Sequence, residues 1–354
     1  MSLIMWHLFL HCYFYSFKTI FWNKFCFIKR MKLLITTFFL LLLSLNTLVA
    51  QNFELVDNKV SLYPKHYASA EALAAQIEKD FSSETDKVRA IYKWLTLNIN
   101  YDIEAYYNGQ SRVNFSYSDQ EDLHRKLTAI NTHTINQTFR TNKAICEGYA
   151  QTFRKVSELI GIPSLFISGY SKSTISDIDN IPQQEDHAWN GVKINGKWFL
   201  LDATWGAGHT LGNGWVQKFD DYYFLTKPEE FALTHLPKES GFLFTDKKIK
   251  TEEFYSTPIF KKAFSLNNLK LLAPLKGKVL VKTNDSITFK MGKIPQNVNL
   301  HYAYRTNMHP EKIEPKCSAS SCTFKIPFTS DKDTELFIIA NRETALQYKI
   351  IVKN

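Results

Sequence analysis

Three residue types in one chain order could carry nucleophilic chemistry. A thiol, Cys146, is followed by an imidazole, His187, and then by a carboxylate, Asp202. Such a set can act as nucleophile, general base and orienting acid. Each residue alone has an ordinary explanation, because a single cysteine or histidine is more often a packed core residue. The case for chemistry therefore depends on the local structure that brings the three together.

Cys146 stands at the predicted start of a helix that continues from Gln151 to Ile160 and stops at Gly161. At the first position of a helix, a thiol meets free backbone N–H groups and the positive end of the helix dipole, which favour the thiolate. Glu147 adds negative charge beside the thiol, although it also complements the helix N-terminus. This position suits a nucleophile, with a buried structural cysteine as the alternative.

The sequence also predicts how His187 meets Asp202. Asn195-Gly196 between two apolar runs is typical of a two-residue hairpin turn of type I′. With that register, Trp189 would face Asp202, and His187 would be a diagonal neighbour of Asp202 on one face. Diagonal Cβ atoms lie about 7 Å apart. A carboxylate in an otherwise apolar strand needs a partner, so we expect a hydrogen bond between these two side chains.

The segments around these residues resemble the transglutaminase-like superfamily of papain-type Cys-His-Asp enzymes, and within it the kyphoscoliosis peptidase-like branch with its bacterial relatives. The resemblance covers roughly Ala68 to Lys238. Its motifs are Trp94 to Asp102, Ala144 to Ala150, His187 to Asn190, Trp198 to Gly206, Tyr222 to Leu225 with Pro228, and His235 to Pro237.

The resemblance implies a fold of the α+β class with a papain-like core. It also implies that Cys146 is the nucleophile, His187 the base and Asp202 the orienting acid of a thioester mechanism. Water as the acceptor would give hydrolysis, and a lysine amine would give cross-linking. The sequence contains no Asp-rich loop of the EF-hand kind. We therefore expect neither a metal nor another cofactor.

Four aromatic residues are candidates for lining the site or stabilising an oxyanion. The backbone N–H of Cys146 is a natural first oxyanion donor, and the second donor is left open. Core packing is the alternative for each candidate. The candidates are Trp94, Tyr101, Trp189 and Trp205.

The chain before Gln51 has the sequence features of an export signal. Residues 31–50 read as a signal peptide, with cleavage after Ala50. Residues 1–30 read as a mis-called upstream extension. A membrane anchor through residues 33–48 is the alternative, although this apolar run is short for a spanning helix. We expect a secreted or periplasmic protein without stable membrane insertion once the signal is removed.

Charge gives no case for a nucleic-acid partner. The whole chain has 43 basic and 34 acidic residues and a net charge of +9. Five basic residues and no acidic ones precede Gln51. Their removal leaves 38 basic against 34 acidic residues, a modest excess without a basic patch. The partner that we expect is instead a protein or peptide substrate, such as one of the cell envelope.

Cys317 and Cys322 flank a short polar loop that suits a local disulfide in an oxidising compartment. Two free thiols on adjacent strands are the alternative. No second Cys or His pair is nearby in the sequence, which argues against zinc.

The sequence predicts two domains after the leader. Residues 51–250 would form the transglutaminase-like catalytic domain, in which 103–143 is an irregular excursion with one short helix over 121–130. Residues 262–354 hold short strands between turn signals and would form a small antiparallel β-sandwich of the Ig-like kind.

These patterns favour a thiol enzyme that acts on peptide or carboxamide bonds, a peptidase or amidase. Protein-glutamine cross-linking is the alternative within the enzyme class. A catalytically idle envelope binding or scaffold protein is the alternative outside it.

Overall fold

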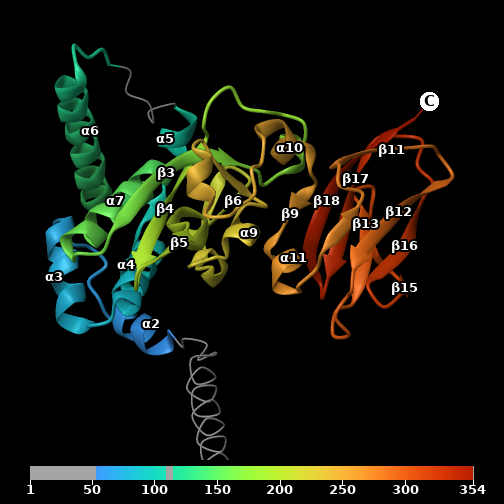
Figure 1. Cartoon of the computed structure of the whole chain (residues 1–354), viewed down its shortest axis with the longest axis horizontal. Coiled ribbons are helices and arrows are strands. Elements are labelled where there is room, and N and C mark those ends of the chain that lie inside the picture. The colour runs from blue at the N-terminus through green and yellow to red at the C-terminus, as the bar shows by residue number, and fades with distance from the viewer. Residues whose placement is uncertain (1–52, 109–114, 354) are drawn as a thin grey trace, which may run out of the picture. The chain divides into compact units, whose positions relative to one another are not determined.

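The computed structural model describes residues 53–108 and 115–353 (Figure 1). The leader, the upstream extension and the membrane anchor predicted within residues 1–50 lie outside the described residues. Leu55–Asn354 forms one compact unit. Within the described ranges, none of the helices combines the length and the apolar character needed to cross a membrane.

The N-terminal helices begin where the sequence provides capping side chains. Ser69 Oγ accepts a hydrogen bond from the N–H of Ala72 at 3.4 Å, and Ser83 Oγ accepts one from Asp86 at 3.1 Å. Such caps satisfy donors that a helix end leaves free. The two serines therefore mark where α3 and α4 begin. The bounds are α2 Glu54–Ser61, α3 Ala70–Asp80 and α4 Glu84–Asn98.

The segment over residues 103–143 is more helical than the sequence predicts. In place of one short helix over 121–130, the structure has α5 (Ile103–Tyr107) and the 22-residue α6 (Gln120–Thr141). The prediction of an irregular excursion with a short helix is therefore wrong for most of its length.

The physical reason lies in how α6 is buried. Asp119 caps the helix, because its Oδ1 accepts the N–H of Asp122 at 2.8 Å. The buried apolar side chains of α6, Ile135 and Phe139, both lie in its second half. The first half lacks the apolar stripe from which a helix is predicted, so only the capping aspartate marks its start.

One helix and four antiparallel strands form the centre of the core. The strand order is β5-β4-β3-β8, and α7 packs against β3 and β4 (Figure 1). Two further strands, β1 and β2, pair in parallel and form a separate two-stranded sheet. The bounds are β1 Asn100–Tyr101, β2 Lys143–Ala144, α7 Cys146–Leu159, β3 Ser164–Ser171, β4 His187–Ile194, β5 Lys197–Leu201 and β8 His235–Pro237.

The hairpin between β4 and β5 has the predicted turn and register. Asn195 and Gly196 have φ values of 48° and 80°, as both central residues of a type I′ turn require. Ile194 pairs with Lys197. The register is therefore the one deduced from the turn residues.

Asp202 departs from the prediction, because it follows β5 instead of extending it. It is the N-cap of α8 (Ala203–Ala207), and its Oδ1 accepts the N–H groups of Thr204 at 2.8 Å and Trp205 at 3.1 Å. Aspartate is a favoured N-cap residue, and the cap ends the strand pairing. The expected cross-strand pairing of Trp189 with Asp202 is therefore wrong.

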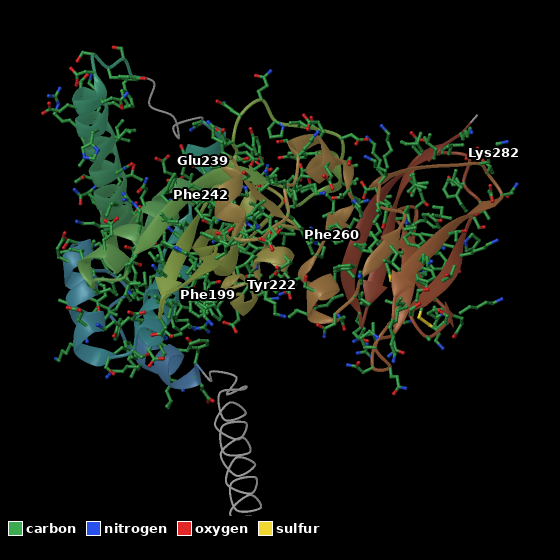
Figure 2. All side chains as sticks on the ribbon, viewed as in Figure 1. Phe199, Tyr222, Glu239, Phe242, Phe260 and Lys282 are labelled. Carbon is green, nitrogen blue, oxygen red and sulfur yellow. A yellow bond between two sulfur atoms is a disulfide. The ribbon has the colours of Figure 1, made fainter. Side chains whose placement is uncertain are left out.

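The aromatic-rich segment after residue 220 packs onto the core. The ring of Phe224 lies 5.0 Å from that of Tyr92, and Phe244 stacks on Trp198 at 5.7 Å. Tyr222 of this segment is labelled in Figure 2. The elements from residue 208 onward are β6 Gly208–Leu211, β7 Gly214–Gln217, η2 Asp221–Tyr223, α9 Pro228–Phe231 and η3 Ser240–Leu243.

A short connecting segment joins this core to the C-terminal strands. It contains α10 (Thr251–Ser256), β9 (Ile259–Phe260) and α11 (Lys262–Leu266). The buried ammonium of Lys172 donates hydrogen bonds to the carbonyl oxygens of Phe254 at 2.6 Å and of Thr257 and Pro258 at 3.1 Å each. One buried lysine of the core therefore holds three backbone oxygens of the connecting segment.

Two sheets make up the C-terminal region, and their inner faces share one apolar core. Phe289 of one sheet meets Tyr348 of the other with ring centroids 5.3 Å apart. The short strands expected over residues 262–354 are present, and most pairs are antiparallel, although β11 and β18 pair in parallel. The bounds are β10 Leu271–Ala273, β11 Lys278–Val281, β12 Asp285–Gly292, β13 Leu300–Tyr304, β14 Asn307–Lys312, β15 Lys316–Cys317, β16 Ser321–Phe328, β17 Thr334–Ala340 and β18 Glu343–Val352.

The predicted disulfide is formed between Cys317 and Cys322, which pair across β15 and β16. Figure 2 shows it as a yellow bond among the C-terminal strands. The alternative of two free thiols is therefore wrong for this structure. The division into domains over 51–250 and 262–354 and the Ig-like assignment stay predictions.

Candidate active site

Cys146 is the first residue of α7, as the sequence predicts, and its side chain is partly exposed. The first turn of α7 lies close to its neighbours, because a Cβ on Gly148 would be 2.7 Å from Ala144 Cβ and 2.9 Å from Thr138 Oγ1. Burial raises the pKa of the Glu147 carboxyl.

Asn190 links α7 to the sheet. Its Nδ2 donates hydrogen bonds to the carbonyl oxygens of Ala150 and Leu165, both at 3.0 Å. Ala150 lies one turn after Cys146 in α7, and Asn190 lies three residues after His187 in β4. This buried amide therefore helps to set the distance between the helix that begins with the thiol and the strand that begins with the imidazole.

The three residues predicted to act together lie in one hydrogen-bonded chain. His187 Nε2 is 2.7 Å from Asp202 Oδ2, which is the hydrogen bond expected from the sequence. The side chain of Cys146 is hydrogen-bonded to the imidazole of His187. Since Nε2 of His187 faces Asp202, Nδ1 is the ring nitrogen that can interact with the thiol. Asp202 is fully buried and His187 is 8% exposed, so little water competes with these contacts.

Charge stabilises the imidazolium–carboxylate state of this pair. Burial disfavours the charged forms of both groups, but their mutual attraction and hydrogen bond outweigh it. The pKa of His187 is therefore raised above its ordinary value, and the pKa of Asp202 is lowered. At neutral pH this state provides a proton on His187 beside the thiol of Cys146.

His235 is a residue of this site that was not among the predicted site residues. Its Nε2 lies 3.1 Å from Asp202 Oδ2, the oxygen that also meets His187. Its Nδ1 lies 2.9 Å from Thr234 Oγ1. The side chain is almost fully buried, and burial lowers its pKa to about 4. Its position in the motif His235 to Pro237 of the family resemblance could have identified it.

His187, Asp202 and His235 are close enough together to be considered as a metal site, because their possible ligand atoms lie within 4.8 Å of one another. Two of these contacts, however, have the lengths of N–H···O hydrogen bonds. A metal ion would have to replace the protons that satisfy the buried carboxylate. We therefore assign the three side chains to a hydrogen-bond network.

A cleft of about 770 Å³ opens beside His187. Two of the four predicted aromatic residues, Tyr101 and Trp205, line it. The ring of Trp205 lies 5.5 Å from that of His187, and Tyr101 stacks on Trp215 at 5.3 Å. Trp215 belongs to the hairpin formed by β6 and β7, and no sequence motif named above predicts that it lines the cleft.

The other two predicted aromatic residues belong to the core. Trp94 is fully buried, and its Nε1 donates to the carbonyl oxygen of Pro64 at 2.9 Å. Trp189 is 1% exposed and packs against Phe231 and His235. Neither tryptophan lines the cleft, so the core alternative holds for both.

The cleft also has a wall outside the core. Phe260 of β9 and Glu343, Thr344 and Gln347 of β18 line it together with His187. Phe260 pairs with Leu346 of β18 and is labelled in Figure 2. The C-terminal strands therefore contribute side chains to the surroundings of the imidazole.

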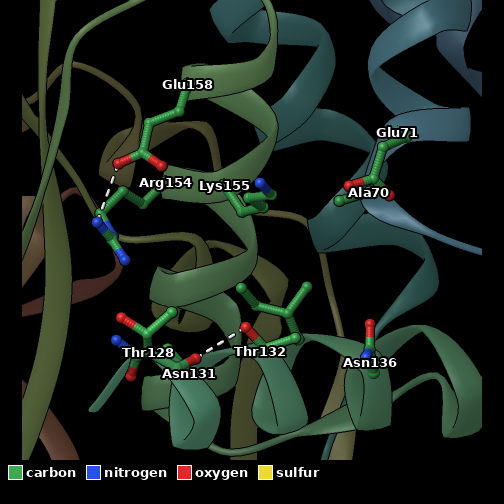
Figure 3. A pocket seen from close by; sticks show the side chains of 10 residues that line it. Ala70, Glu71, Thr128, Asn131, Thr132, Asn136, Arg154, Lys155 and Glu158 are labelled. Carbon is green, nitrogen blue, oxygen red and sulfur yellow. Dashed lines mark hydrogen bonds and ion pairs between the residues drawn. The ribbon is translucent and has the colours of Figure 1, made fainter. Parts of the chain in front are cut away.

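A second, smaller pocket of about 350 Å³ lies among α3, α6 and α7 (Figure 3). Its charged groups partly neutralise each other, since Arg154 Nη1 pairs with Glu158 Oε1 at 2.9 Å. None of the three residues predicted to be catalytic lines it. The cleft beside His187 is therefore the better candidate for substrate binding.

Comparison with known proteins agrees with this geometry. Residues 71–203 match the family model of the transglutaminase-like superfamily. The chain is 28% identical to kyphoscoliosis peptidase of Mus musculus over 195 residues, which is 54% of this chain and 27% of that protein. It is 23% identical to hillarin of Drosophila melanogaster over 228 residues, 60% of this chain and 25% of hillarin.

The chain thus spans about a quarter of the length of these curated relatives. Among solved structures, a TGase crystal structure matches with a TM-score of 0.27 and 21% identity, covering 50% of this chain and 37% of the other. Residues 71–203 contain Cys146, His187 and Asp202, so the matched region includes the complete hydrogen-bonded chain.

Proposed function

Because the chain contains a transglutaminase-like domain over residues 71–203, we propose that it is a thiol enzyme acting on peptide or carboxamide bonds. The observation that carries the proposal is the chain of hydrogen bonds from Cys146 through His187 to Asp202. In it, Cys146 is the nucleophile, His187 the general base and acid, and Asp202 the group that orients and charges the imidazole.

The reaction has two halves. Cys146 Sγ attacks the carbonyl carbon, and the C–N bond breaks as His187 Nδ1–H transfers its proton to the departing amine. The product of this half is a thioester on Cys146 and a free amine. Water then attacks the thioester while Nδ1 of the neutral His187 removes its proton, which releases a carboxylic acid and returns the proton to the imidazole–thiol pair.

Two groups are candidates for stabilising the oxyanion. The N–H of Cys146 belongs to the first turn of α7, where backbone donors have no partner within the helix. Tyr101 pairs with Ala144, two residues before Cys146, and lines the cleft. The charge of Cys146 is among the influences that raise the pKa of Tyr101, after burial. We propose the Tyr101 hydroxyl as the second donor.

A polypeptide is the proposed substrate. The cleft is open, is lined by aromatic rings and by polar side chains, and continues past the imidazole to the C-terminal strands. Such a surface suits an extended chain with side chains on both sides of the reacting bond. Substrates of the cell envelope fit the proposed export of the protein.

The experiment that tests the function is mass spectrometry of the products formed from a peptide library, with and without an added primary amine. Hydrolysis is expected, with new carboxyl termini or deamidated side chains and a mass change independent of the amine. The matched control is Cys146→Ala, which should form no product. Product formation by Cys146→Ala at the wild-type rate would refute the thiol mechanism.

Two alternative functions give different results in the same experiment. A transglutaminase would add the mass of the amine to glutamine-containing peptides. An idle binding protein would leave every peptide unchanged, and its Cys146 would react with iodoacetamide no faster than a thiol in an unfolded peptide.

We also propose that the protein is exported, with residues 31–50 as a signal peptide and Gln51 as the first mature residue. The Cys317–Cys322 disulfide supports an oxidising compartment. Intact-mass analysis of the protein recovered outside the cytoplasm tests this proposal. A mass that includes residues 33–48 would favour the anchored alternative.

A further inference from the structure

Asp202 accepts four hydrogen bonds, two on each oxygen. Its Oδ1 accepts the backbone N–H groups of Thr204 and Trp205. Its Oδ2 accepts from His187 at 2.7 Å and from His235 at 3.1 Å. A carboxylate offers about four acceptor positions, so those of this buried group are filled. The proposed reaction uses His187 and leaves His235 without a role.

The surroundings of His235 fix where its proton lies. Asp202 is a carboxylate and can only accept, so Nε2 of His235 must carry a hydrogen. The ring is enclosed by aromatic side chains, with Phe231 stacked at 4.0 Å and Trp205 at 4.4 Å. Burial in this environment disfavours a second proton. Nδ1 is then an acceptor, and the hydroxyl of Thr234 at 2.9 Å can donate to it in place of its longer contact of 3.4 Å with the carbonyl oxygen of Phe231.

Two N–H donors on one oxygen compete for the same charge. Each donor withdraws electron density from Oδ2, so each weakens the hydrogen bond of the other. If His235 were absent, Oδ2 would attract the proton of His187 more strongly. The imidazolium would then be too stable to release its proton readily to a departing amine.

We infer that His235 is a positioning residue of the proposed active site, which donates a second hydrogen bond to Asp202 Oδ2 and thereby moderates the Asp202–His187 pair. This inference rests on the proposed function. His235 is not among the residues that line the cleft, and it acts through its hydrogen bond to Asp202.

Most of the other titratable groups near this network are buried tyrosines. Burial raises the pKa of Tyr223, which faces His235, well above its ordinary value. The pKa values of the other tyrosines that interact with Asp202 are also raised, and burial is the largest cause for each of them. The titratable groups around the network are Cys146, Asp186, Tyr92, Tyr101, Tyr149 and Tyr223.

The test is a pH titration of the full chain labelled with ¹⁵N-histidine and followed by NMR, which reports the tautomer and protonation of each ring without a substrate. The wild-type His235 should stay neutral, with its proton on Nε2, between about pH 5 and about pH 9. A proton on Nδ1, or a titration near the ordinary histidine value of about 6.5, would overturn the inference.

Variants separate the electronic role from packing. His235→Phe keeps a ring but removes the donor, and the apparent pKa of His187 should rise by roughly half a unit. His235→Gln keeps one N–H donor and should return the His187 titration toward that of the wild type. Unfolding curves check that the variants keep the fold.

An unchanged or lowered pKa of His187 in folded His235→Phe would show that His235 only packs. If that variant fails to fold, Thr234→Val offers a second comparison. Loss of the donor to Nδ1 should leave that nitrogen unsatisfied and shift the ¹⁵N signals of His235, whereas unchanged signals would contradict the proposed tautomer. These readouts are independent of product formation, so failure of the proposed function and failure of this inference are distinguishable.

Discussion

His187 and Asp202 are joined by a hydrogen bond of 2.7 Å, although Asp202 does not lie in the strand that pairs with the strand of His187. The two oxygens of the carboxylate have different partners. One oxygen caps α8, and the other holds the imidazole. Because the cap fixes the carboxylate relative to the backbone, the imidazole is oriented by a helix terminus and not by strand register.

Replacing Asp202 by asparagine should separate these two tasks. The amide oxygen can still cap α8, but the amide N–H₂ would face the N–H of His187, so the imidazole loses its acceptor. We expect turnover to fall by about 10³- to 10⁴-fold with a much smaller loss of stability. Product formation measured by mass spectrometry checks this result.

The matched control is Asp119→Asn, which makes the same change at the N-cap of α6. It should leave turnover close to that of the wild type. Equal losses in both variants would mean that capping, not orientation of His187, explains the effect.

The His187–Asp202 pair should make stability depend on pH. The folded pKa of Asp202 lies below its ordinary value of 3.8, so its stabilisation is present above about pH 4 and is lost as the pH falls further. The folded pKa of His187 lies above 6.5, so its stabilisation is complete below that pH and is lost as the pH rises toward the folded value.

The free energy of unfolding of the wild type minus that of His187→Gln should therefore be largest between about pH 4 and pH 6.5 and should decline at higher pH. Urea unfolding at a series of pH values measures this difference. A difference that increases above pH 7 would contradict the direction of the His187 shift.

The sequence predicts those parts of the site that depend on local rules. The turn at Asn195-Gly196 determines the register of β4 and β5, and the start of α7 determines the place of Cys146. Asp202 was assigned to the wrong element, because an aspartate after an apolar strand can extend the strand or cap a following helix. Only the tertiary structure shows that it caps.

His235 and Trp215 were missed for another physical reason. Each reaches the site from an element that has no short-range relation to Cys146 or His187 in the sequence. His235 lies in β8, which pairs with β3 on the side away from β4. Spacing along the chain cannot predict that such a strand brings a second imidazole to Asp202.

Lys172 should be important for stability. Its buried ammonium meets the carbonyl oxygens of Phe254, Thr257 and Pro258. Burial lowers its pKa to about 7, so the group is partly charged at neutral pH. Lys172→Met leaves these oxygens without their donor, and we expect a loss of about 3 kcal/mol in the free energy of unfolding.

Lys290→Met is the control, because Lys290 is an exposed lysine in a strand of the C-terminal region. It should change the unfolding free energy by less than about 0.5 kcal/mol. Equal effects of the two substitutions in urea unfolding would show that the buried contacts contribute little.

The disulfide should contribute modestly. Cys317 and Cys322 close a short loop, for which the chain-entropy estimate is about 2 kcal/mol. The Cys317→Ser, Cys322→Ser variant should lose about that much stability and keep its turnover. Peptide mapping without reduction should find these two cysteines linked and Cys146 free for alkylation. A free thiol at either position in the wild type would contradict the bond.

The proposed oxyanion role of Tyr101 predicts a specific kinetic change. Tyr101→Phe keeps the ring that stacks on Trp215 but removes the hydroxyl. Because an oxyanion forms only in the transition state, kcat should fall by about 10²-fold while KM stays nearly constant. Tyr107→Phe is the control, since Tyr107 lines the same cleft and is 70% exposed. A raised KM with unchanged kcat in Tyr101→Phe would assign its hydroxyl to substrate binding instead.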